Sequence, residues 1–225
     1  MDGEGLIKAD LHIHTCFSGD SDTTPEALVE RCRELGLGCI AVCDHNTTDG
    51  ARAVEAIAPF KVIVSEEIMT TRGEIIGMFL QQTIPSGLGA AETIQRIRQQ
   101  GGLVCIPHPF DPYRSSGMQA DALSGIVCDI DIVEVFNART IPLQNMARPR
   151  NFARKHHLRM GAGSDAHTPG EVGRAYVTIP DFSGREEFLE AMRHSRVHGN
   201  SANPLLVVAG LPARLQRKLF GGHKA

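Results

Sequence analysis

The sequence predicts an α/β domain whose strands form a mainly parallel sheet. Short apolar runs, most of them rich in Val or Ile, alternate along the chain with longer segments of helical pattern. Continuous apolar runs of this kind are typical of strands that are buried on both faces. Capping residues mark where many of the longer segments begin and end. Strands that alternate with helices indicate βα units, in which successive strands lie parallel.

Eight apolar runs predict the strands. They are Leu6–His14, Cys39–Asp44, Lys61–Ser65, Ile75–Leu80, Leu103–Pro107, Ile132–Val135, Arg159–Gly163 and Ala175–Ile179. The chain has 225 residues, of which 42% are hydrophobic, so it is long enough to enclose one large core.

Six segments between these runs predict helices. They are Pro25–Leu35, Gly50–Ile57, Ala90–Gln100, Ala120–Ser124, Leu143–His157 and Arg185–Ser195. Thr24 supplies a capping hydroxyl before a proline at the first helical position. Ser183 and Glu186 have the spacing of a capping box. Gly36 and Gly101-Gly102 follow helices at the place where a left-handed residue is favoured.

The last segment, residues 201–225, differs from the preceding 200. Its stretch Pro204–Phe220 places Leu and Val residues among Arg and Lys, as an amphipathic helix does. We expect this helical segment to dock on the body of the protein or on another subunit, which would make the chain a homo-oligomer.

Composition indicates a cytoplasmic protein with no membrane partner. The formal net charge of -3 gives no basis for non-specific nucleic-acid binding, although a local basic patch is compatible with a nucleic-acid substrate. The six cysteines include no CxxC pair, which favours reduced thiols over a disulfide framework. We find neither a leader pattern nor an apolar run as long as a membrane span.

Residues that can bind metals recur at one place, the end of each apolar run. They are His12 and His14, Asp44-His45, Glu66-Glu67, His108, Glu134 with Asn137, and Asp165 with His167. In parallel α/β folds the carboxyl ends of the strands form the functional face, so these side chains are expected to converge. Each residue alone is typical of a hydrogen-bonded structural position. The repeated placement favours a metal site.

The first strand strengthens this hypothesis. Asp10, His12 and His14 alternate with Leu11 and Ile13, so an extended strand places the three polar side chains on one face. A bound metal is the strongest reason to gather them there.

These motifs resemble the polymerase and histidinol phosphatase (PHP) superfamily. The resemblance is carried, in order, by Asp10-Leu11-His12-Ile13-His14-Thr15, Ser18-Gly19-Asp20, Asp44-His45, Glu67-Ile68, His108-Pro109 and Gly163-Ser164-Asp165-Ala166-His167. The segment Glu134–Arg139 is most similar to the small stand-alone phosphoesterases of this superfamily. The resemblance implies a distorted (β/α)7 barrel over residues 1–200, followed by the helical appendage 201–225. It also implies two or three divalent ions, Mn, Fe or Zn, at the carboxyl ends of the strands.

The resemblance further implies which residues hold the ions. The ligands are His12, His14, Glu67 and Asp165 for the first ion, Glu67 and His108 for the second, and Asp20, His45 and His167 for the third. Asp22 is the alternative to Asp20 in the same loop. Superfamily members with three full positions have another His after the strand that carries Glu134, and this chain has none there. Asn137, Gln144 or a water would take its place, or one metal position is short of a ligand.

The implied activity is hydrolysis of a phosphomonoester, or of a nucleotide or oligonucleotide phosphate ester, by a metal-bridging hydroxide. No protein nucleophile is predicted, because packing is the favoured interpretation of Cys16. Arg114, Arg139 and Arg174 are expected to bind the phosphate of a small-molecule or nucleotide substrate, because a guanidinium binds oxyanions in a bidentate manner. The alternatives are a histidinol-phosphate phosphatase and a non-catalytic regulatory PHP module.

Overall fold

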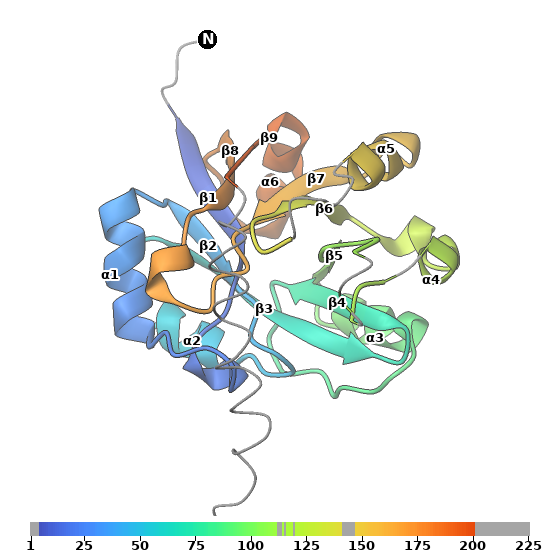
Figure 1. Cartoon of the computed structure of the whole chain (residues 1–225), viewed down its shortest axis with the longest axis horizontal. Helices are drawn as coiled ribbons and strands as arrows, with labels where there is room; N and C mark the ends of the chain where they lie inside the picture. The colour runs from blue at the N-terminus through green and yellow to red at the C-terminus, as the bar shows by residue number, and fades with distance from the viewer. Residues whose placement is uncertain (1–4, 112–113, 115, 119, 141–146, 201–225) are drawn as a thin grey trace, which may run out of the picture.

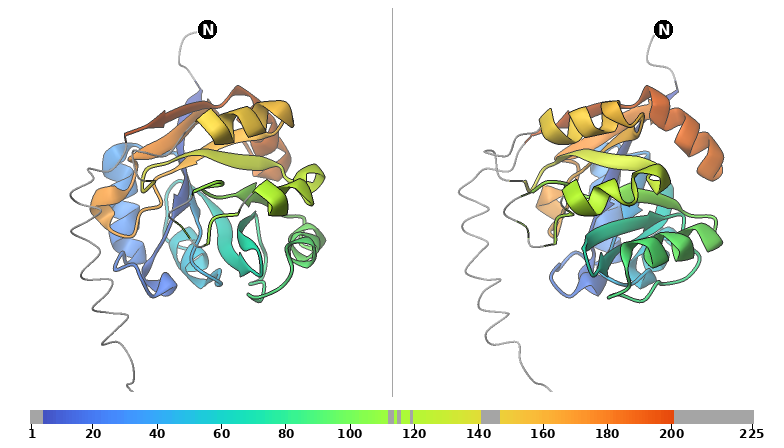
Figure 2. Two further views of the ribbon diagram at one scale, coloured as in Figure 1. Left: turned by 45° about the vertical axis from the view of Figure 1, so that its right-hand side comes forward. Right: turned by 90° about the vertical axis from the view of Figure 1, so that its right-hand side faces the viewer.

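A computed structural model describes residues 5–111, 114, 116–118, 120–140 and 147–200. Within them, nine strands form one sheet in the order β7-β6-β5-β4-β3-β2-β1-β8-β9. The strands are β1 (Leu6–Ile13), β2 (Cys39–Val42), β3 (Lys61–Thr70), β4 (Gly73–Met78), β5 (Leu103–Ile106), β6 (Ile132–Asn137), β7 (Arg159–Gly163), β8 (Ala175–Pro180) and β9 (Arg196–Gly199). The sheet curls until β7 approaches β1, as Figures 1 and 2 show.

Helices α1–α5 lie on the outside of the curled sheet (Figure 1), and α6 packs against the apolar cluster on its inner face. They are α1 (Pro25–Leu35), α2 (Asp49–Glu55), α3 (Ala90–Gln99), α4 (Ala120–Ser124), α5 (Ala147–Lys155) and α6 (Gly184–Ala191), with short 3-10 turns at Cys16–Ser18, Val127–Asp129, Pro169–Glu171 and Met192–His194. The described helices include none that is long and apolar enough to cross a membrane. The predicted appendage 201–225 lies outside the described residues, as does the start of the helix predicted over Leu143–His157.

Local capping signals predict the first helix correctly. The Thr24 side chain accepts a hydrogen bond from the Ala27 amide at 3.3 Å, Pro25 begins the helix, and Gly36 ends it in the left-handed region at φ 63°. The capping box predicted at Ser183 is wrong. The Ser183 side chain makes no capping bond, and its amide donates instead to Glu187. The expected partner, Glu186, is paired with Arg185.

The prediction of a mainly parallel sheet is also wrong. Four neighbouring pairs are parallel (β1–β2, β2–β3, β5–β6 and β6–β7), and four are antiparallel (β3–β4, β4–β5, β1–β8 and β8–β9). The acidic pair Glu66-Glu67 suggested that the third strand ends at Ser65, but β3 continues to Thr70 and turns back into β4. Buried acids are tolerated inside β3 because they have partners. Glu66 accepts from the Ile84 amide at 2.8 Å.

The seam between β1 and β7 closes the barrel. Asp165 donates its amide to the His12 carbonyl at 2.7 Å, and His14 donates its amide to the Ala166 carbonyl at 2.9 Å. A Cβ at Gly163 would overlap the Cβ of His12, so only glycine permits this approach. The seam therefore brings the ends of β1 and β7 together.

Three apolar clusters pack against the two faces of the sheet. One packs α1 and α2 against β1–β3, and a second packs α3–α5 against β3–β6. The third joins strand residues such as Leu11 and Cys105 to Phe188 and Met192 near the end of the described chain. All six cysteines are free thiols, and four of them are buried. This packing holds the strand ends, and the side chains they carry, in defined positions.

Candidate metal centre

The structure brings all eight predicted ligands together at the carboxyl end of the parallel strands. They come from the end of β1 (His12, His14), the loop after it (Asp20), the residue three positions beyond β2 (His45), the middle of β3 (Glu67), the turn after β5 (His108) and the loop after β7 (Asp165, His167). His108 and Asp165 have left-handed backbones, at φ 28° and 53°. Such strain is commonly found at functional sites, where the surrounding structure holds it in place.

The first group of ligands encloses one point. The Nε2 atoms of His12 and His14 are 3.0 Å apart, and each is 3.5 Å from a carboxylate oxygen of Glu67. Oδ1 of Asp165 lies 3.4 Å from the same nitrogen of His14. Donors bonded to a tetrahedral ion at about 2.1 Å are roughly 3.4 Å apart, so this spacing fits a divalent metal.

An orphaned oxygen supports the same interpretation. Oδ1 of Asp165 is buried and has no hydrogen-bond partner among the described residues, whereas Oδ2 receives Arg114 and Asn137. A buried carboxylate oxygen without a partner is costly unless a cation meets it. The donor set therefore fits the ions that the sequence predicts.

The outward-facing nitrogens of the histidines are held by other side chains. Nδ1 of His12 is 3.2 Å from Glu134, and Nδ1 of His14 is 2.9 Å from the Ser18 hydroxyl. Ser18 in turn donates to Asp44 at 2.9 Å. Partners of this kind fix the ring orientation of metal-binding histidines. The sequence placed Glu134 and Asp44 at strand ends, but only the structure shows that they support ligands.

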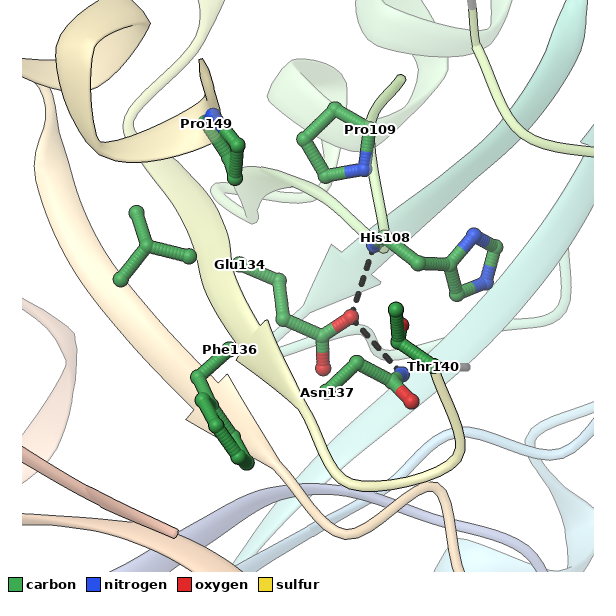
Figure 3. A pocket seen from close by; sticks show the side chains of 8 residues that line it. His108, Pro109, Glu134, Phe136, Asn137, Thr140 and Pro149 are labelled. Carbon is green, nitrogen blue, oxygen red and sulfur yellow. Dashed lines mark hydrogen bonds between the residues drawn. The ribbon is translucent and has the colours of Figure 1, made fainter. Parts of the chain in front are cut away.

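Glu134 connects two of these ligands (Figure 3). Its Oε2 atom accepts from the His108 amide at 2.7 Å and from the Asn137 amide group at 3.0 Å. Asn137 also donates to Asp165, and its own oxygen accepts from the Arg139 amide. Asn137 thus supports ligands instead of replacing the missing His. Gln144, the other replacement considered, lies outside the described residues.

Asp10, which was expected to share the metal-facing side of β1 with His12 and His14, binds backbone amides instead. Its carboxylate accepts from the backbone amides of Ser164 and Gly173, at 2.9 and 3.0 Å. It therefore ties β1 to the loops after β7 and after the Pro169–Glu171 turn. The expectation that it joins the two histidines at a metal is not met.

Around Glu67 lies a second group. Nε2 of His108 is 3.0 Å from Oε1 of Glu67, and Nδ1 of His45 is 3.2 Å from Oε2. Glu67 thus faces the first group and these two histidines at once, which is the position a bridging carboxylate requires. Glu74 of β4 also faces this group, and sequence analysis missed it. Its signal was a charged residue directly before the apolar pair Ile75-Ile76.

The third group is the most exposed. Oδ2 of Asp20 lies 3.1 Å from Nε2 of His167 and 3.6 Å from Nε2 of His45. The side chains of Asp20 and His45 are 41% and 30% exposed, whereas His14, which is buried, lies beside both histidine rings. Asp20, the predicted loop ligand, thus lies close to both His45 and His167.

Burial and neighbouring charges shift the pKa values of these groups. Burial opposes the charged carboxylate of Asp165, but Arg114 and His12 hold its pKa well below the usual range. Burial also disfavours the charged form of His45, but Asp20 and Glu67 raise its pKa to about 9. Burial and His167 lower the pKa of His14 to about 3.

The three predicted phosphate-binding arginines differ in their surroundings. Arg114 donates to Oδ2 of Asp165 at 2.5 Å. Arg139 lies 3.3 Å from Glu171 and 3.4 Å from the Asp165 carbonyl. Arg174 lies farther along, and its backbone amide donates to Glu171. Arg114 and Arg139 thus border the metal centre.

The fold and the cluster together define an α/β barrel with a multidentate His and carboxylate site. The chain belongs to the PHP family: residues 10–140 match the PHP domain, and residues 145–197 match the PHP-associated region. The predicted family and barrel are therefore confirmed.

Relatives extend over most of the chain. An uncharacterized protein of Methanocaldococcus jannaschii is 34% identical over 198 residues, which cover 83% of this chain and 79% of the relative. A second from the same organism is 41% identical over 147 residues, 59% of this chain and 82% of the relative. The 5'-3' exoribonuclease Rnm of Escherichia coli is 46% identical over 56 residues, 25% of this chain and 17% of that enzyme.

Solved structures share the fold at low identity. A two-domain Bacteroides vulgatus protein containing a predicted PHP-like metal-dependent phosphoesterase superposes with a TM-score of 0.73 at 18% identity, covering 89% of this chain and 66% of that protein. PsfC of Pseudomonas syringae superposes with a TM-score of 0.70 at 17% identity, covering 94% and 99%. At such identities the likeness establishes the barrel alone.

Proposed function

We propose that this protein is a metal-dependent phosphoesterase that holds two or three divalent ions, Mn, Fe or Zn. The observation that carries the proposal is the convergence of imidazole and carboxylate atoms around Glu67. Mixed nitrogen and oxygen donors of this kind suit these three metals. Ions held there would lower the pKa of bound water and polarise phosphoryl oxygens.

The protein's own residues would position both the ions and the substrate. Glu67 lies between two groups of donors, so its negative charge would offset two neighbouring cations. Glu134 and Ser18 hold the histidine rings in place. Arg139, at the rim, would bind non-bridging phosphate oxygens through its planar guanidinium. Arg114 would do the same only by sharing its contact with Asp165.

We propose a nucleotide or a short oligonucleotide as the substrate class. The Cys16–Ser18 turn, in which the Ser18 hydroxyl accepts from the His45 amide at 3.0 Å, also carries Phe17, whose side chain is 46% exposed. Exposed aromatic rings stack on nucleobases. The similarity to an exoribonuclease over 56 residues supports the same class. Phe110, another aromatic near the centre, is buried beneath Arg148.

A phosphoester panel tests the activity. Metal-depleted protein reconstituted with Mn2+ is expected to hydrolyse p-nitrophenyl phosphate or one of a set of nucleoside phosphates, 5'-phosphorylated oligonucleotides and histidinol phosphate. His12→Ala is expected to abolish turnover. Wild type that is fully loaded with metal yet inactive on the whole panel would favour a regulatory module. Preference for histidinol phosphate would favour that phosphatase.

Arg139→Ala tests the phosphate site. We expect at least a tenfold loss of kcat/KM with unchanged metal content, because the side chain contacts no predicted metal-ligand side chain. Arg96→Ala, on the surface of α3, is the matched control. Unaltered kinetics would remove Arg139 from the substrate site.

A further inference from the structure

A buried carboxylate on β4, that of Glu74, faces the metal centre. The residue is only 4% exposed, and its side chain lies on the same face of the β3–β4 hairpin as Glu67. In this register Glu67 pairs with Ile76 and Met69 pairs with Glu74, so the two acids are diagonal neighbours. Because β4 runs antiparallel, its first residues lie at the end of the barrel where the parallel strands finish.

The distances around Glu74 match those of a ligand. Its Oε2 lies 3.5 Å from Nε2 of His108, and its Oε1 lies 3.9 Å from Nδ1 of His45. His45, Glu67 and Glu74 each offer one atom, and these atoms all lie within 4.8 Å of one another. Nδ1 of His108, on the far side of that ring, has no hydrogen-bond partner among the described residues.

We propose that Glu74 is a ligand of the second metal position, together with Glu67 and His108. The inference rests on the metal-binding part of the proposed function. It fills the position that the sequence left short of a ligand, and it does so from β4 instead of from the segment after β6. Two carboxylates and one imidazole form a mixed oxygen and nitrogen donor set that suits Mn2+, Fe2+ and Zn2+.

The protein holds Glu74 in place through its neighbours. Gly73 has φ 119°, and a Cβ there would lie 2.9 to 3.0 Å from the backbone of Met118 and 3.0 Å from the carbonyl of Ser116. This close approach lets the Glu74 amide donate to the Ser116 carbonyl at 2.9 Å. Preorganisation of this kind is what a ligand carboxylate needs.

The charges of Glu67 and Glu74 give a second reason to place a metal ion between them. Glu67 and Glu74 are both almost fully buried, and two buried carboxylates side by side are costly without a cation between them. The basic groups that face Glu74 are the imidazoles of His45 and His108, which carry charge only when protonated. A divalent ion neutralises the pair whatever the protonation of the imidazoles.

Metal binding to the full chain tests the inference without any substrate. Metal-free wild type, Glu74→Gln and Glu74→Asp would be titrated with Mn2+ by calorimetry, and the loaded proteins analysed for metal content. We expect Glu74→Gln to lose about one equivalent of Mn2+, or to bind it at least roughly tenfold more weakly, since even residues that only support ligands contribute 10–100-fold. Glu74→Asp, which keeps the charge on a shorter stem, should weaken the same position less.

Glu66→Gln is the matched control. Glu66 is buried beside Glu67, but its carboxylate accepts from the Ile84 amide and contacts no predicted ligand side chain. We expect wild-type stoichiometry and affinity in this variant, with circular dichroism confirming the fold of each protein. An equal loss in Glu66→Gln would overturn the inference.

Two outcomes separate the inference from the proposed activity. Wild-type Mn2+ stoichiometry and affinity in a folded Glu74→Gln protein would overturn it, whether or not the wild type hydrolyses phosphoesters. Should Glu74→Gln fail to fold, wild-type binding by Glu74→Asp would overturn it equally. Loss of one equivalent supports it even if the panel of phosphoesters finds no substrate.

Discussion

The metal centre has an enclosed side and an open side. On the enclosed side His12, His14 and Asp165 are almost fully buried, and hydrogen bonds with the Glu134 carboxylate and the Ser18 hydroxyl hold the two histidine rings. On the open side Asp20 and His45 are 41% and 30% exposed. The side chains on the enclosed side are held by their neighbours, whereas Asp20 and His45 on the open side are in contact with solvent. Burial thus separates a structural half of the centre from an accessible half.

The largest effect is expected from a substitution at the seam between β1 and β7, on the enclosed side of the centre. Gly163→Ala forces a Cβ into His12, and we expect it to destabilise the protein by on the order of 4 kcal/mol or to prevent soluble expression. Gly170→Ala, near the open side, places its Cβ in open space and is the control. Urea unfolding of both variants measures the difference. Equal midpoints would show that the seam relaxes freely.

Removing the enclosed carboxylate should have the next largest effect. Asp165→Ala removes the shorter of the two carboxylate contacts of Arg114, which keeps only that with Asp111 at 3.6 Å. We expect a loss on the order of 3 kcal/mol in the metal-free protein, together with at least one metal equivalent. Urea unfolding and metal analysis measure the two losses. In the double variant with Arg114→Ala, most of the destabilisation should be recovered. Simple additivity of the two substitutions would mean that the pair is not coupled.

On the open side a ligand change should leave stability nearly untouched. Asp20→Asn is expected to weaken one metal position by roughly tenfold and to change the free energy of unfolding by less than about 1 kcal/mol. Asp22→Asn, in the same loop, is the control and should bind metal like wild type. If Asp22→Asn is the weaker binder, the assignment of the loop ligand is reversed.

The smallest expected effect concerns the reactivity of exposed and buried cysteine thiols. Cys16, in the turn on the open side, and Cys128 are exposed, while Cys32, Cys39, Cys43 and Cys105 are buried. Burial raises the pKa of the Cys32 thiol to about 12, which disfavours its reactive thiolate. We expect Ellman's reagent to label two thiols rapidly in the folded protein and all six after unfolding. Rapid labelling of more than two would indicate that the barrel opens.

The fold was predictable wherever its signals are local. Thr24, Pro25 and Gly36 define α1 through contacts within a few residues, and apolar runs mark most strands. The short edge strand β9 was not predicted, because Arg196–Gly199 is largely exposed and has no apolar pattern. The antiparallel direction of β4 was not predicted either, because tertiary contacts, and not composition, decide how strands pair.

The sequence by itself, through its resemblance to the PHP superfamily, predicted the eight side chains that the structure brings together at one end of the barrel. Tertiary structure alone decided which groups support them, that Arg114 meets Asp165, and that Glu74 joins Glu67. Such pairings join residues far apart along the chain, so no local pattern encodes them. They exist because the seam at Gly163 and the hairpin at Gly73 bring distant segments within a few ångströms.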